Sequence, residues 1–351
     1  MFRVFRTPRW LLALWVVQAG TVLVFLSFAG ALPLIKSEWG LSNAQAGVIQ
    51  AATQAGYITA VLVLSSVTDY LPMRRLLPAC ALWAGLANLG FALLARDMTS
   101  AIVWRALTGM GVAGIYMPGV RLISERVSAE RRGGSVGVFV SAFTLGSAAS
   151  IALGGSLSTV LGWRTAFALL SAGPIVGALV VWRALPGMPP KLAQQPAPDA
   201  GPSIAELLRN RPALLAIGAY TAHTWEVLGL RSWLPAFLAT ALMIAGRSLH
   251  AATAAGAGLA GTATLTGAAA TAAVGALSDR AGRSLTIIMV ASVSLILMLS
   301  MGFVLGAPLI LAVSVAIIVA VAANADSAVI STTLTENVPS RYLGRALAMY
   351  S

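Results

Sequence analysis

The chain has 351 residues, 58% of them hydrophobic and only 10% charged, and its formal net charge is +12. Soluble domains carry about 25% charged residues, so this composition excludes an ordinary soluble protein and indicates a membrane protein. The positive charge does not indicate nucleic-acid binding, because the basic residues lie in short gaps between apolar runs instead of on one polar surface. The single cysteine, Cys80, excludes an intramolecular disulfide, and with two histidines in the chain we expect no metal and no cofactor.

Ten stretches are long and apolar enough to cross a bilayer, since a spanning helix needs about 20 apolar residues. We expect them near residues 10–32, 44–67, 76–95, 100–123, 135–160, 165–185, 213–243, 251–278, 285–304 and 309–334, with an eleventh helix beginning at Ala346. The first resembles a signal peptide because it follows three arginines. Its apolar run is too long for a signal core, so we expect an uncleaved membrane helix.

Residues 186–212 differ from the rest of the chain, because prolines and polar residues replace the apolar run. Such a composition predicts a cytoplasmic linker between an N-terminal half, residues 1–185, and a C-terminal half, residues 213–351. With the N-terminus in the cytoplasm, 17 of the 23 Lys and Arg residues lie on the inside, four lie in outer loops, and Arg105 and Arg231 lie within spans. This asymmetry predicts the orientation of both halves.

Two short segments occur twice at nearly the same separation, which indicates duplication of a multi-helix unit. Asp279 in the segment 275–283 lies 210 positions after Asp69 in the segment 65–75. Gly344 in a second segment also lies 210 positions after its counterpart, Gly134. Adding 210 to the residues 134–185, which hold the fifth and sixth helices, places their counterparts in the second half at residues 344–395. The sequence ends at Ser351, so we expect a chain that lacks the last two of twelve helices.

These motifs resemble those of the major facilitator superfamily, and the resemblance covers the whole chain. The loop motif is Gly275, Asp279, Arg280, Gly282 and Arg283, with a weaker first copy that keeps Asp69, Arg74 and Arg75. The resemblance implies an all-α fold of two pseudo-symmetric helical halves. It also implies a gate, in which an acid at a cytoplasmic helix end pairs with basic residues and holds one conformation closed. The alternative is a positively charged loop that only sets the topology.

Two further motifs carry the resemblance. Arg105, Gly109 and Gly111 in span four resemble a motif whose arginine takes part in proton coupling or senses substrate charge, with a purely structural ion pair as the alternative. Glycines in span five resemble an antiporter-type motif in which small residues let helices approach closely; they are Gly137, Gly146, Gly154 and Gly155. This sequence has Ser150 and Ile151 where the family has Gly-Pro.

Span seven holds polar residues that are unusual in a membrane helix. Glu226 lies about 20 Å along a helix that starts at Ala213, inside a hydrocarbon core of about 30 Å. His223 lies three residues earlier on the same face, so we expect proton exchange near neutral pH with Glu226 as the coupling residue. The alternative is a static ion pair between Glu226 and Arg105 or Arg231.

Other polar residues could line a substrate cavity if they face inward. They are Tyr220 and Trp225 in span seven, Gln18 in span one, Gln50, Gln54 and Tyr57 in span two, and Asn324 and Asp326 in span ten. Asp326 lies nearer the cytoplasmic side, where it could join the gate instead of the pocket. Polar residues are also common in helix–helix contacts, which is the alternative for each of them.

The sequence therefore predicts a monomeric, multi-pass inner-membrane transporter with its N-terminus in the cytoplasm. It would move a small organic solute by alternating access, coupled to protons, with efflux by antiport favoured by span five. The alternatives are proton-coupled uptake of a small organic anion, with Arg105 and Arg231 as counter-charges, and a non-transporting membrane protein. We expect no enzymatic activity, because no nucleophile–base pair is evident at useful spacing.

Overall fold

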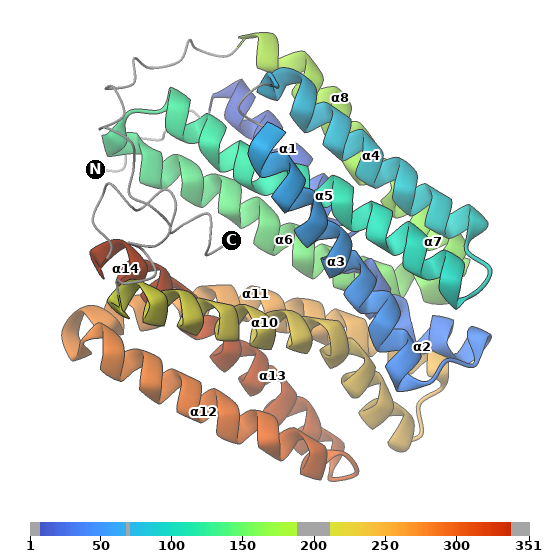
Figure 1. Cartoon of the computed structure of the whole chain (residues 1–351). Helices are drawn as coiled ribbons and strands as arrows, with labels where there is room; N and C mark the ends of the chain where they lie inside the picture. The colour runs from blue at the N-terminus through green and yellow to red at the C-terminus, as the bar shows by residue number, and fades with distance from the viewer. Residues whose placement is uncertain (1–7, 68–70, 188–210, 338–351) are drawn as a thin grey trace. The chain divides into compact units, whose positions relative to one another are not determined.

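The computed structural model describes residues 8–67, 71–187 and 211–337, and the regular elements in these residues are all helices (Figure 1). Asp69, the centre of the predicted linker 186–212, and the helix expected from Ala346 lie outside the described residues. The described part of the chain contains ten segments that are long and apolar enough to span a membrane, from Arg9–Trp39 to Leu309–Thr333. The predicted all-α fold with ten spans is therefore confirmed.

The helix boundaries agree with the predicted spans to within a few residues, except where a span is broken. The helices before the linker are α1 (Arg9–Val22), α2 (Ser27–Trp39), α3 (Asn43–Val67), α4 (Met73–Leu94), α5 (Met98–Arg126), α6 (Ala129–Leu161), α7 (Trp163–Leu170) and α8 (Ala172–Ala184), followed by the 3₁₀ turn Leu185–Gly187. Those after it are α10 (Arg211–Ile244), α11 (Leu249–Ala281), α12 (Arg283–Val304), α13 (Leu309–Ala325) and α14 (Ser327–Asn337).

Three predicted spans are not continuous helices. The first span, expected at 10–32, is interrupted between α1 and α2 and continues to Trp39. The sixth is interrupted at Ser171 and the tenth at Asp326. Hydropathy alone does not predict the first break, because residues 23–26 are as apolar as the helices on either side, whereas the other two breaks lie at the polar residues Ser171 and Asp326. A break in a membrane span leaves backbone groups that other parts of the protein must satisfy.

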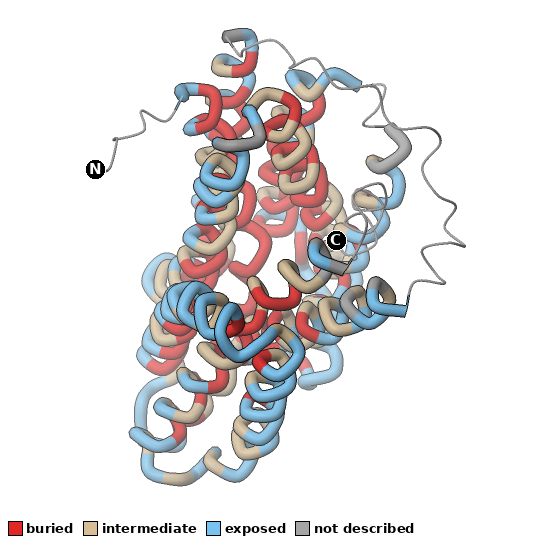
Figure 2. The backbone as a smooth tube through the Cα atoms, turned by 90° about the vertical axis from the view of Figure 1, so that its left-hand side faces the viewer, coloured by how far each residue is buried: buried red, intermediate tan, exposed pale blue. Residues whose placement is uncertain are grey.

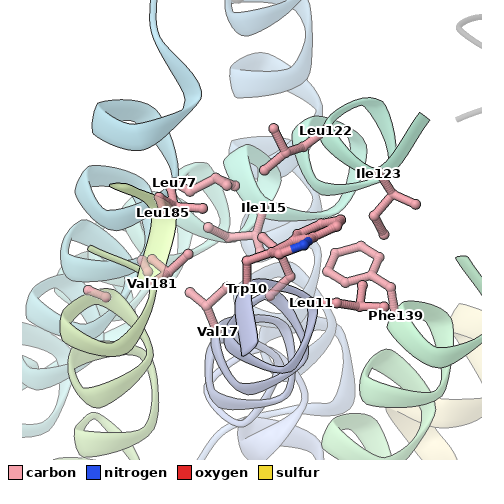
Figure 3. Packing of buried hydrophobic residues seen from close by; sticks show 13 residues of the cluster. Trp10, Leu11, Val17, Leu77, Ile115, Leu122, Ile123, Phe139, Val181 and Leu185 are labelled. Atoms are coloured by element: carbon pink, nitrogen blue, oxygen red, sulfur yellow. The ribbon is translucent and has the colours of Figure 1, made fainter. Parts of the chain in front are cut away.

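The chain divides into two compact units, Met1–Ala193 with Pro235–Gly261, and Gln194–Leu234 with Thr262–Ser351. In the first unit, a hydrophobic cluster joins α1, α4, α5, α6 and α8 (Figure 3). Its labelled members include Trp10, Val17, Leu77, Ile115, Phe139 and Val181. Along the helices, buried and exposed residues alternate with the helical repeat (Figure 2). In the second unit, α12 packs against α13 and α14.

The boundary between these units differs from the predicted halves for residues 235–261. Small residues explain the grouping, since a Cβ on Gly261 of α11 would lie 2.9 Å from the carbonyl oxygen of Ala148 in α6. A Cβ on Gly155 of α6 would lie 3.3 Å from the carbonyl oxygen of Thr253 in α11. The beginning of α11 therefore packs on α6, and the division into halves 1–185 and 213–351 stays a prediction.

The glycines expected to allow close helix packing differ in their surroundings. A Cβ on Gly146 would lie 2.9 Å from the carbonyl oxygen of Ala19 in α1, and a Cβ on Gly154 would lie 2.5 Å from that of Ser27 in α2. Gly155 has similarly little space, whereas Gly137 has no atom within 4 Å of such a Cβ. Three of the four positions thus lie where α6 touches another helix.

Gly154→Ala and Gly137→Ala make a matched pair within α6. The added methyl group at Gly154 would overlap the backbone of α2, so we expect Gly154→Ala to destabilise the protein by about 1–3 kcal/mol. Gly137→Ala should leave stability unchanged or slightly raised, because alanine favours the helix and meets no neighbour. Thermal unfolding of the purified protein in detergent measures both, and equal shifts for the two variants would contradict this packing.

Candidate functional site

Arg105 of α5 supports the break between α1 and α2. Its side chain is fully buried, and all three guanidinium nitrogens have hydrogen-bond partners. Nη1 donates to the carbonyl oxygen of Val24 at 3.0 Å and Nη2 donates to that of Phe25 at 2.8 Å. Further bonds run to Thr53 Oγ1 at 3.1 Å and to Asn88 Oδ1 at 3.3 Å. Arg105 therefore satisfies backbone oxygens that the broken helix leaves unpaired.

Ser150 of α6 supports the same break from a different helix. Its hydroxyl donates to the carbonyl oxygen of Leu23 at 2.6 Å and accepts from the backbone N–H of Leu26 at 3.1 Å. Sequence reasoning noted Ser150 only as a departure from the family's Gly-Pro. In this chain, Ser150, which stands where the family has glycine, therefore satisfies backbone groups on both sides of the break between α1 and α2.

The other candidates in the first unit lie near the same region. Gln18 of α1 is buried, and its Oε1 atom has no hydrogen-bond partner among the described residues. Gln50 and Gln54 of α3 are half-buried and lie one turn apart. Tyr57 of α3 lies beside the break, with its ring centroid 5.9 Å from that of Phe25.

In the second unit, His223 of α10 lies between a carboxylate and a hydroxyl from the break between α13 and α14. Its Nδ1 atom lies 2.9 Å from Oδ1 of Asp326, and neither atom has another hydrogen-bond partner among the described residues. Its Nε2 atom lies 2.6 Å from Oγ of Ser327. His223 and Asp326 are 7% and 5% exposed. This line of hydroxyl, imidazole and carboxylate can pass a proton from one end to the other.

Glu226 lies one turn after His223 and has a different partner. It accepts a hydrogen bond from the hydroxyl of Ser294 in α12. It makes no ion pair with Arg231, because the only hydrogen bond of Arg231 in the described residues goes to Asn324. Among the described residues, the structure therefore does not show the ion pair between Glu226 and Arg231 that was the alternative from the sequence, and the hydrogen-bond partner of this carboxylate is a hydroxyl.

Arg231 and Asn324 form a third polar contact between α10 and α13. Nη2 of Arg231 donates to Oδ1 of Asn324 at 2.8 Å. The Asn324 amide is held in this orientation because its Nδ2 donates to the carbonyl oxygen of Ala320 at 2.7 Å. Thr271 of α11 donates to the carbonyl oxygen of Asn324 at 2.8 Å. Nε of Arg231 is buried without a hydrogen-bond partner in the described part of the chain.

The two aromatic candidates of span seven point in different directions. The ring of Tyr220 lies 6.0 Å from that of His223, so Tyr220 belongs to the polar face of α10. Trp225 is 84% exposed and contributes to none of these contacts. The structure therefore brings together Tyr220, His223, Arg231, Asn324 and Asp326, with Glu226 on the adjacent face, but not Trp225.

The loop motif of the second unit forms an ion-pair network between the ends of three helices, α11, α12 and α14. Arg283, the first residue of α12, donates to Oδ1 of Asp279 at 2.6 Å and to Oγ of Ser278 at 2.5 Å. It also donates through Nη2 at 3.0 Å and Nε at 3.3 Å to the two carboxylate oxygens of Glu336 in α14. Gly282 has a φ of +88°, which glycine adopts readily, and its position turns the chain from α11 into α12.

This network joins two of the duplicated segments, since Asp279 lies in the segment 275–283 and Glu336 begins the segment 336–345, the one that contains Gly344. Sequence reasoning did not predict this bridge. Arg280 and Gly275 do not belong to this network. A Cβ on Gly275 would make only an ordinary van der Waals contact, 3.8 Å from Cβ of Ala328. In the first copy, Arg74 and Arg75 are exposed at the start of α4, and Met73 stands 210 positions before Arg283.

The described residues contain no group of three or more His, Cys, Asp or Glu side chains that could hold a metal ion.

Comparisons with known proteins agree with the fold. The model of the family described as "Major Facilitator Superfamily" matches residues 14–351. "Putative uncharacterized transporter YgaY" of Escherichia coli (strain K12) is 33% identical over 159 residues, which cover 45% of this chain and 39% of that protein. "Benzoate transport protein" of Acinetobacter baylyi is 24% identical over 163 residues, covering 44% and 34%. The matched segments thus span less than half of these relatives.

A solved structure has the same fold over almost the whole chain. It is a bacterial homolog to the human lysosomal transporter Spinster, in an inward-facing and occupied conformation, with a TM-score of 0.77. It is 19% identical in sequence, and the match covers 97% of this chain and 78% of that one. At this identity the likeness shows the fold alone.

Arg105→Lys and Arg231→Lys should differ in their effect on stability. A lysine keeps the charge but cannot replace the four hydrogen bonds that Arg105 makes from three nitrogens, so we expect a loss of about 2–5 kcal/mol. Arg231→Lys removes one bond and should cost about 1 kcal/mol or less. Thermal unfolding in detergent compares the two, and a smaller effect at Arg105 would contradict its structural role.

Proposed function

The chain belongs to the major facilitator superfamily, and on this premise we propose that it is a secondary active transporter of a small organic solute. It would work by alternating access, in which two conformations expose one binding site to either side of the membrane in turn. The broken helices support the proposal, because irregular backbone within a membrane is tolerated where it lines a site or is buried in protein. The relatives carry the word transporter or transport in their names.

Proton coupling is the second part of the proposal, and the polar contacts of the second unit carry it. His223 and Asp326 face each other, so a proton on the imidazole leaves two opposite charges that offset each other. Glu226 has a hydroxyl as its hydrogen-bond partner and makes no ion pair among the described residues, so binding a proton would neutralise its charge. We therefore assign the coupling proton to Glu226, with His223, Asp326 and Ser327 as its relay.

The direction we propose is efflux by antiport. Its support is the close packing of α6 at Gly146, Gly154 and Gly155, the glycines of the antiporter-type motif. Uptake by proton symport is the competing mode, and it would use the same proton site. The two modes differ in a measurable way, because antiport moves protons against the solute and symport moves them with it.

The location we propose is the inner membrane of a bacterium, with the N-terminus in the cytoplasm and the chain acting as a monomer. The excess of Lys and Arg in the segments expected inside supports this orientation. The partners are then the lipid bilayer, protons and a small-molecule solute. The solute would cross the membrane chemically unchanged.

The network around Arg283 would act as a gate on the cytoplasmic side. It connects the start of α12 to the end of α11 and to α14, so these helix ends move together while the ion pairs hold. Breaking one pair should weaken the closed conformation without unfolding a helix, because both carboxylates are largely exposed.

Glu226→Gln tests the proton site. The amide keeps the size of the side chain and its contact with Ser294 but cannot release a proton, so a pH gradient should no longer drive transport. Exchange of labelled for unlabelled solute, which needs no net proton movement, should continue. Proteoliposomes of the purified chain, with protein-free liposomes as the blank, measure both.

Glu38→Gln is the matched control, since Glu38 is also a glutamate of a span but pairs with Arg164 at the exposed end of α2. Transport by this variant should remain coupled to the pH gradient. Normal coupling in Glu226→Gln would remove Glu226 from its role, and loss of exchange as well would indicate a damaged protein instead of an uncoupled one.

Asp279→Asn tests the gate. The substitution removes one of the two carboxylates that hold Arg283, and an exposed pair is worth about 1 kcal/mol or less, so we expect transport to slow by up to about fivefold. Asp97→Asn serves as the control, because Asp97 caps α5 and asparagine caps equally well. An unchanged rate in Asp279→Asn would contradict a gating role for this pair.

A further inference from the structure

Arg231 is a half-buried cation that makes no ion pair among the described residues, and one of its guanidinium nitrogens has no hydrogen-bond partner there. Among the described residues, its one hydrogen bond goes to the neutral amide of Asn324. Its Nε atom is buried and unpaired. A buried donor without a partner, on a charged group in a membrane span, destabilises the protein and calls for an explanation.

Arg105 shows what a purely structural arginine looks like in this protein. All of its nitrogens are occupied by oxygen atoms of the first unit, and none of its surface is exposed. Arg231 is half-buried and keeps donor capacity unused. Of the two arginines expected to provide counter-charges, Arg231 alone can accept a new partner without losing an existing one.

The surroundings of Arg231 are arranged as one face. Tyr220, His223, Val227 and Arg231 follow each other at three- or four-residue steps along α10, so they share a face of that helix. Asn324, held by Ala320 and Thr271, fixes one edge of the guanidinium. The other edge is left to pair with two oxygens of an anion, for which the planar guanidinium is suited.

A lipid phosphate does not fit this position. Arg231 lies near the middle of the span Ile217–Ile244, and the hydrocarbon core is about 30 Å thick, so either headgroup layer is about 15 Å away. An anion that enters the span from water would supply the partner that Nε of Arg231 lacks among the described residues.

We propose that Arg231, positioned by Asn324, binds the anionic group of the transported solute, and that the solute is a small organic acid with an aromatic or other flat apolar body. The ring of Tyr220 on the same face supplies the apolar contact. This proposal rests on the proposed transport function. The proton site at Glu226 is separate from the anion site, so the two can fail independently.

Benzoate and benzamide are the probes, because they differ in charge and share a ring. Binding is measured at equilibrium to the full chain in nanodiscs at neutral pH, without a gradient. Benzoate should bind and benzamide should not. Arg231→Gln should weaken benzoate binding by roughly tenfold or more, and Arg231→Lys by less. Arg247→Gln removes an exposed loop charge and should change nothing.

Chemical modification gives a readout that does not depend on the choice of solute. Phenylglyoxal, which reacts with arginine, should modify Arg231 but not the enclosed Arg105, as detected by mass spectrometry of the peptides. Benzoate, acetate or inorganic phosphate should protect Arg231, and benzamide should not.

Two results would overturn the proposal. One is an Arg231 that reacts no faster than Arg105, or reacts without protection by any of the three anions. The other is equal binding of benzoate and benzamide. Retained benzoate binding in Glu226→Gln with lost pH-driven transport would support both the anion site and the separate proton site. Benzoate binding by a chain that transports nothing would refute the transport function alone.

Discussion

The structure depends on one constraint, which is that every polar group within a bilayer must find its partner inside the protein. The break between α1 and α2 leaves backbone groups unpaired at the centre of the first span. Arg105 and Ser150, from two other helices, supply the missing donors and acceptors. These bonds connect α5 and α6 to the break between α1 and α2, and they hold the first span in its bent conformation.

The second unit meets the same constraint in a way that leaves some groups unsatisfied. Asp326 and Ser327 at the break between α13 and α14 face His223, while Glu226 relies on a hydroxyl and Arg231 on an amide. Groups that are only partly satisfied can exchange partners at low cost in energy. That is why the proposals for the proton and for the solute both lie here, whereas Arg105 is given a structural role.

Much of the fold could be predicted from the sequence, since spans are set by the length of apolar runs. The break between α1 and α2 could not, because the residues at 23–26 are as apolar as their neighbours. The pairing of side chains depends on helix rotation, which hydropathy does not report. His223 was therefore linked to Glu226 on its own helix, and its contacts with Asp326 and Ser327, about 100 residues away, were missed. Likewise, nothing in the sequence indicates that Ser150 bonds to the break between α1 and α2. Nor does the sequence indicate that Glu336 pairs with Arg283.

A proton gradient should drive solute movement through this chain. Solute and proton fluxes can be recorded together in proteoliposomes of the purified chain while the pH gradient is reversed. We expect the solute to accumulate against its own gradient, opposite to the proton flux, and its direction to reverse with the pH gradient. A solute that only equilibrates, with the same rate in both gradients, would contradict proton coupling.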